Sequence, residues 1–61
     1  MLSEHSVIIA TEKINENVDK GCRGVIVYMY NNGIFEVEFF DDNRRTISVN
    51  TVSRNQISEL A

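Results

Sequence analysis

The chain has 61 residues, of which 43% are hydrophobic and 25% are charged, and it contains three glycines and no proline. A chain of this length forms one domain, residues 1–61. Without a disulfide or a structural metal, its core supplies only about 3–5 kcal/mol of folding free energy. Its single cysteine cannot form an internal disulfide, and a set of Cys and His ligands for a structural zinc is missing. The composition therefore excludes folds that depend on an internal disulfide or a zinc site, and the core must be well packed or completed by a partner.

Nine acidic and six basic residues give a formal net charge of −3. Proteins that bind phosphates usually carry a basic excess, because Lys and Arg displace condensed counterions. Nucleic acid is therefore disfavoured as the main partner. An acidic surface suits a basic protein partner, although the same charge also serves simply to keep a small protein soluble.

Targeting signals are not expected in this chain. Residues 1–10 lack the basic and apolar segments of a signal peptide, and the longest apolar run, Val25–Tyr30, is too short to span a membrane. With one free cysteine, the sequence predicts a cytoplasmic protein with no membrane association.

Three segments are rich in Val, Ile, Tyr and Phe, which favours strands: Ser6–Ala10, Val25–Phe40 and Thr46–Val52. Between the first two, residues 11–19 are polar and form either a long loop or one amphipathic turn. In the third segment Ile47 and Val49 alternate with polar residues, which predicts a half-buried strand with these two side chains inward.

The central segment is predicted to be a hairpin, because Asn31-Asn32-Gly33 divides it. A two-residue turn would place Val27 opposite Glu38 and bury charge. A three-residue loop with a left-handed Gly33 places Tyr28 opposite Glu36 and Val27 opposite Val37, and we expect this register. It collects one apolar face (Val25, Val27, Met29, Phe35, Val37, Phe39) and leaves Ile26, Tyr28, Tyr30, Ile34, Glu36 and Glu38 on the other.

The remaining signals complete an all-β chain. Residues 41–44 read as a turn, and Ser53 followed by Gln56 has capping-box spacing, which predicts a single helical or 3₁₀ turn before a last strand at Ile57–Leu60. Five short strands, with a long loop after the first and a helical turn before the last, predict a small SH3-like barrel. A three-stranded meander with a short N-terminal helix is the alternative.

Several motifs resemble a family of small bacterial proteins of unknown function: Lys20-Gly21-x-x-Gly24-Val25-Ile26-Val27, Phe35-Glu36-Val37-Glu38-Phe39, Asp41 and Arg45-Thr46. The resemblance runs from Val7 to Leu60, and the Gly-x-x-Gly-Val part is also similar to the start of a KOW motif in ribosomal and elongation-factor barrels. The family usually has glycine where this chain has Arg44. A turn that needs a positive φ there must use Asn43 or strain Arg44 at a cost of about 1 kcal/mol.

The residue inventory argues against an enzyme, a cofactor or a metal site. His5 is the only histidine and lies near the N-terminus, where fraying is expected. Cys22 lies beside Lys20 and Arg23, and positive charge lowers a thiol pKa, but a half-buried turn cysteine is the simpler expectation. Gly21-Cys22-Arg23-Gly24 matches the KH clamp loop only superficially, since a strand follows it, and both glycines are expected to permit a tight turn.

The candidate partner-binding surface combines exposed tyrosines with acidic residues: Tyr28, Tyr30, Glu36, Glu38, Asp41 and Asp42. Tyrosines supply rigid contact area at interfaces, and the carboxylates would repel phosphates. A second, basic patch would suit nucleic acid: Lys20, Arg23, Arg44, Arg45 and Arg54. Simpler roles are open for both sets, namely cross-strand packing for the tyrosines and a surface ion pair of Arg45 with Asp41 or Asp42.

These features favour a non-catalytic protein-binding module. Small acidic proteins of this kind look like immunity or antitoxin proteins, which block a basic, nuclease-like toxin. The first alternative is a KOW-like barrel that binds RNA or the ribosome, and the second is an accessory subunit that forms homo-oligomers through an apolar strand face.

Overall fold

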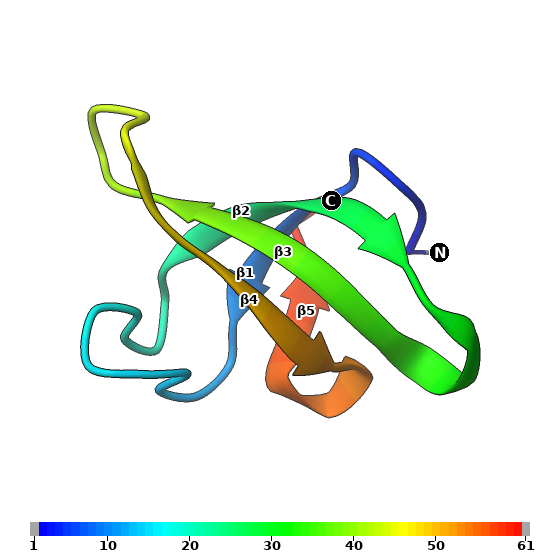
Figure 1. Cartoon of the computed structure of the whole chain (residues 1–61). Helices are drawn as coiled ribbons and strands as arrows, with labels where there is room; N and C mark the ends of the chain where they lie inside the picture. Colours follow the sequence, from blue (N-terminus) through cyan, green and yellow to red (C-terminus); the bar gives the residue numbers. More distant parts are fainter. Residues whose placement is uncertain (1, 61) are drawn as a thin grey trace.

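The structure is a computed structural model that describes residues 2–60 and is all-β (Figure 1). It contains five strands and two 3₁₀ turns: β1 (Val7–Ala10), β2 (Arg23–Met29), η1 (Asn31–Gly33), β3 (Ile34–Phe40), β4 (Thr46–Ser53), η2 (Arg54–Gln56) and β5 (Ile57–Glu59). The strands form one antiparallel sheet in the order β4-β3-β2-β1-β5. The predicted order of five strands, with a long loop after the first and a helical turn before the last, is confirmed.

The sheet twists so that β2, β3 and β4 pass across β1 and β5, and the core lies between these two layers (Figure 1). Each strand contributes to the buried cluster, and the loop between β1 and β2 adds one residue: Ile8, Ala10, Val18, Ile26, Phe35, Val37, Phe39, Val52 and Ile57. Within residues 2–60 the strands β4 and β5 are not paired, so the barrel stays open between them.

Strand β3 alternates as its sequence predicts. Phe35, Val37 and Phe39 are at most 3% exposed and face the core, whereas Glu36 and Glu38 lie on the outer face and are half-buried. The predicted three-residue loop is also confirmed, with Gly33 at φ 74° and Tyr28 opposite Glu36.

The predicted faces of β2 are wrong for the residues that precede Tyr28, because a β-bulge lies between Ile26 and Tyr28. The bulge adds one residue, so Ile26 rather than Val27 pairs with Val37. Ile26 is fully buried, and Val27 is 42% exposed. On the N-terminal side of the bulge, the even-numbered residues of β2 therefore face the core, where odd-numbered residues were expected.

Strand β4 also differs from the prediction, and again a shift of register is the reason. It begins with an irregularity in its pairing beside Phe39 and Phe40, after which Ser48, Asn50 and Val52 pair with core residues of β3. Val49 lies on the outer face opposite Glu38 and is 56% exposed, contrary to expectation. Ile47 is partly buried against the core, as predicted.

The segment between β1 and β2 is a loop, and it is fastened to the barrel. The Asn15 side-chain oxygen accepts bonds from the backbone of Asn17 (2.7 Å) and Val18 (3.1 Å), and Ile14 N–H donates to Val18 O (2.8 Å). This tight turn brings Val18 into the core, where it is fully buried. Of the two forms predicted for residues 11–19, the loop is the one present.

Arg44 and Gly24 each occupy a backbone position that restricts which residue fits there. Arg44 itself takes the left-handed conformation of the β3–β4 turn, at φ 63°, so the strain expected at that position falls on Arg44 and not on Asn43. Gly24 was expected in a tight turn, but it lies inside β2. A Cβ atom there would stand 2.7 Å from Val37 Cγ1 and 2.9 Å from Glu38 O, so only glycine fits.

The capping box is confirmed at η2, where Ser53 N–H donates to the Gln56 side-chain oxygen (2.9 Å). The last strand ends at Glu59, one residue before the predicted end. No helix within residues 2–60 is long and apolar enough to cross a membrane.

Candidate interaction surface

The outer side of β2, β3 and β4 carries a continuous row of polar and aromatic side chains. Tyr28 lies directly opposite Glu36, which lies opposite Thr51, and Glu38 lies opposite Val49. We call this surface the tyrosine–glutamate face and define it by six residues: Tyr28, Tyr30, Glu36, Glu38, Val49 and Thr51. The register of the hairpin therefore unites the two predicted tyrosines with the two predicted glutamates.

The two tyrosines form a single aromatic unit. Their ring centroids are 4.8 Å apart and the rings are inclined by 68°, an edge-to-face arrangement. Tyr28 remains 52% exposed and Tyr30 46% exposed. The pair thus presents a fixed apolar surface to solvent at little cost in side-chain entropy on binding.

The two carboxylates are held by neutral hydroxyl groups. Glu36 accepts one bond from the Tyr30 hydroxyl on Oε2 (2.9 Å) and one from the Thr51 hydroxyl on Oε1 (2.6 Å), and Glu38 accepts one from the Thr46 hydroxyl. The bond to Glu36, slight burial and the Glu36 charge raise the pKa of Tyr30. These bonds orient both carboxylates without neutralising them.

The threonines were missed by the sequence analysis, because their role depends on the β3–β4 register. Thr46 and Thr51 both lie on the outer side of β4, beside the glutamates. Their positions could have been found only by knowing where the β3–β4 pairing is irregular.

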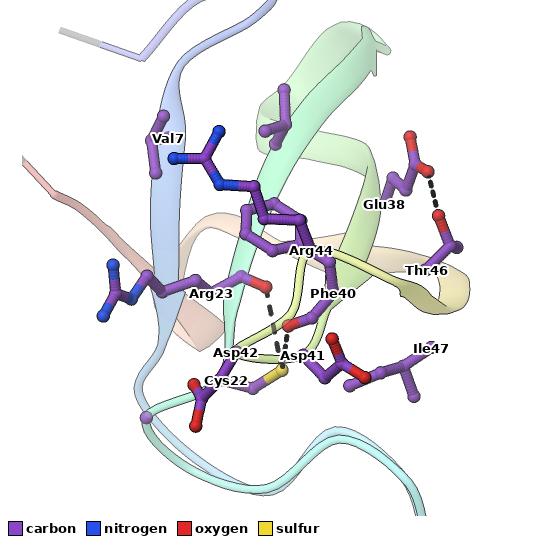
Figure 2. Close-up of a pocket in the computed structure, with 12 residues that line it drawn as sticks. Val7, Cys22, Arg23, Glu38, Phe40, Asp41, Asp42, Arg44, Thr46 and Ile47 are labelled. Carbon is purple, nitrogen blue, oxygen red and sulfur yellow. Dashed lines mark hydrogen bonds between the residues drawn. The ribbon is translucent and has the colours of Figure 1, made fainter.

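A hollow of about 870 Å³ lies beside this face, next to the β3–β4 turn (Figure 2). Glu38, Asp41 and Asp42 line it, but so do Arg23 and Arg44, and Figure 2 shows the Arg44 side chain extending across the hollow. The predicted acidic site is therefore not uniform, since two arginines offset the charge of its aspartates.

Asp41 acts mainly inside its own turn. Its Oδ1 atom accepts bonds from the backbone N–H of Asn43 (2.8 Å) and Arg45 (2.9 Å). The expected contact between Arg45 and Asp41 is therefore a backbone hydrogen bond to the carboxylate. This carboxylate stabilises the turn that carries the strained Arg44.

Cys22 lies in the wall of the same hollow and is half-buried, as expected. Its Sγ atom is 3.6 Å from Phe40 O and 3.7 Å from Arg23 O. Burial, followed by the negative charges of Asp19, Asp42 and Asp41, raises the pKa of the thiol. The pKa of this thiol is therefore raised and not lowered, chiefly because the group is partly buried.

The predicted basic residues do not form one patch. Arg23 and Arg44 line the hollow, whereas Arg54 lines a separate depression with Asn32 and Gly33, at the opposite end of β4. Lys20 precedes the hollow-lining Gly21 and is exposed, and Arg45 is exposed in the turn.

The only histidine of the chain can also be placed. His5 is exposed, and its backbone N–H donates to Ile26 O (2.8 Å), which fastens the segment before β1 to β2. Within residues 2–60 there is no group of three or more His, Cys, Asp or Glu side chains that could hold a metal ion.

The comparisons with known proteins give one match. The model of a family described as "Domain of unknown function (DUF4926)" matches residues 4–59, nearly the whole chain. The search of curated proteins and the search of solved structures each gave no match. The match agrees with the resemblance to small proteins of unknown function, while the likeness to KOW motifs stays a prediction. The chain belongs to the family of domains of unknown function DUF4926.

Proposed function

We propose that this protein is a non-catalytic binding module of the immunity or antitoxin type, which neutralises a basic, nuclease-like protein by occupying its cleft. One observation carries the proposal. On the tyrosine–glutamate face, an exposed aromatic pair adjoins two carboxylates whose hydrogen-bond partners within residues 2–60 are all neutral hydroxyls. A partner that supplies Lys or Arg side chains would complete these charges, and the tyrosines would anchor it.

The arrangement favours a protein over a nucleic acid. The aromatic surface that could stack on bases has Glu36 and Glu38 beside it, and these carboxylates would repel phosphates. The arginines needed for a phosphate-binding surface lie at opposite ends of β4. A basic cleft is therefore a better complement to this side of the barrel than a nucleic-acid backbone.

A non-catalytic role is consistent with the chemistry of the same region. The only cysteine has a raised pKa, so it is poorly suited to act as a thiolate nucleophile at neutral pH. Glu36 and Glu38 are neighbours on one strand and not two carboxylates facing each other across a cleft. The unpaired thiol also fits the cytoplasmic location that the proposal includes.

Co-expression with the product of the neighbouring gene tests the proposal. We expect the two proteins to co-purify and the growth defect caused by the partner to be relieved. Tyr28→Ala and Glu36→Lys should each weaken binding at least tenfold, whereas Glu16→Lys makes the same charge change in the exposed β1–β2 loop and should leave binding unchanged. Thermal unfolding of each variant shows whether the fold is retained.

Two results would overturn the proposal. One is a partner that neither co-purifies nor loses toxicity when this protein is present. The other is salt-sensitive RNA binding that Glu36→Lys strengthens, which would support the KOW-like alternative instead.

A further inference from the structure

The two edges of the sheet differ in how they are protected. The β5 edge is only three residues long. The β4 edge is eight residues long, Thr46–Ser53, and its sequence Thr-Ile-Ser-Val-Asn-Thr-Val-Ser has no charged residue and no proline. Natural proteins usually blunt an edge with short strands, charges or proline, because unpaired backbone groups attract another strand. Only an irregularity at the start of β4 interrupts this edge.

The hydrogen-bond pattern identifies the backbone groups that lie along the β4 edge. Tyr30 N–H donates to Ile34 O, so the even-numbered residues of β3 direct their backbone groups toward β2. The odd-numbered residues therefore bond to β4, where their partners are Ser48, Asn50 and Val52. Between these residues, Val49 and Thr51 direct their N–H and C=O groups away from the sheet.

Several side chains of β4 are also exposed to solvent. Val49 is 56% exposed, and Thr46 and Thr51 are also exposed. Within residues 2–60 no backbone hydrogen bond joins β4 to a strand other than β3. The edge therefore combines open backbone groups, high β-propensity and exposed β-branched side chains.

We propose that β4 pairs antiparallel with β4 of a second copy of this chain, about a two-fold axis at Asn50. In this register Val49 lies opposite Thr51 of the second copy, and Thr51 lies opposite Val49 of the second copy. All of these residues direct their backbone groups to the edge, so each pair exchanges two hydrogen bonds. The two sheets become one continuous sheet, and the open edge disappears.

The composition of the edge favours a second copy as the occupant. Strand β4 carries no charged residue, so two copies of this acidic chain can pair along it without placing like charges opposite each other. Because the axis is perpendicular to the sheet, both tyrosine–glutamate faces lie on the same side of the dimer and can bind a partner together.

Sedimentation equilibrium over micromolar to millimolar concentrations tests the dimer. We expect the mean mass to rise from the 7.0 kDa of one chain toward twice that value. Val49→Pro removes an N–H at the free edge, where proline is tolerated, and Val49→Lys adds an edge charge. Each should weaken dimerisation at least tenfold. Val27→Lys makes the same change at a 42% exposed valine away from the edge and should leave it unchanged.

Amide hydrogen exchange gives a readout at the residues themselves. Protection of the Val49 and Thr51 amides should increase with protein concentration, while that of Ser48 and Asn50, which bond to β3, should not. A chain that stays monomeric throughout overturns the proposal. So does a dimer that survives both Val49 variants, since another surface would then hold it. Both results leave the immunity-type function unaffected, because its test depends on partner binding by Tyr28 and Glu36 and not on dimerisation.

Discussion

The inner and outer faces of β3 use the same strand for different purposes. Phe35, Val37 and Phe39 point inward and are held by close packing, while Glu36 and Glu38 point outward and are held by hydroxyl groups of neighbouring strands. Burial of the first set contributes directly to the hydrophobic stabilisation on which so small a chain depends. The second set contributes little to stability and orients charge toward solvent. Stability and recognition should therefore be separable by substitutions one residue apart.

The largest expected effect is that of Phe39→Ala. It removes a fully buried ring, which costs about 3–5 kcal/mol, as much as the core of such a chain supplies. We expect this variant to be unfolded by circular dichroism at 25 °C. Phe40→Ala is the matched control, because the next ring lies half-buried in the wall of the hollow. Equal loss of structure in both variants would contradict the distinction between the faces.

Gly24→Ala should have the next largest effect. The added methyl group would meet Val37 Cγ1 at 2.7 Å and the Glu38 carbonyl at 2.9 Å, and a backbone atom cannot move aside easily. We expect a loss of about 1–3 kcal/mol in the free energy of unfolding, measured with urea. An unchanged urea midpoint would show that β2 and β3 are not this closely packed.

Arg44→Gly should stabilise the protein. A non-glycine residue in the left-handed conformation costs about 1–2 kcal/mol, and the extra freedom of glycine in the unfolded chain offsets part of the gain. We expect the free energy of unfolding to rise by about 0.5–1 kcal/mol. Arg44→Ala removes the same side chain and keeps the strain, so it should not give this gain.

The smallest effect concerns the protonation of Tyr30. Its pKa is raised above the ordinary 10.0, chiefly by the hydrogen bond to Glu36. The stabilisation from this bond is therefore fully present below about pH 10 and is lost as the pH rises through the folded-state pKa. Tyrosinate absorbance of a Tyr28→Phe variant should show a late titration for Tyr30. Adding Glu36→Ala should bring it back toward the ordinary value, and no change would contradict the role of the bond.

The sequence was sufficient for features that depend on nearest neighbours. The alternation in β3, the loop at Gly33 and the capping box at Ser53 each follow from local chemistry, and all are confirmed. The bulge at Val27 was not predictable in this way. It depends on how β2 pairs with β3, so Ile26 and Val27 were placed on the wrong faces.

The candidate site shows the same division. The joining of Tyr28 and Tyr30 with Glu36 required only the hairpin register, which the Asn31–Gly33 loop determines. The separation of Arg54 from Arg44 depends on the length of β4 and on the turn at each of its ends. Charge composition alone gives no information on such distances.

The pairing of β1 with β5 has a consequence for the order of folding. The hairpins of β2, β3 and β4 join residues close in sequence, whereas Thr11 bonds with Asn55 and Gln56 across more than two thirds of the chain. Closing so long a loop is slow, because its entropic cost precedes any reward from contacts. We expect β5 to dock last and to open first, so the amides of the three-residue β5 should exchange with solvent faster than those of β3.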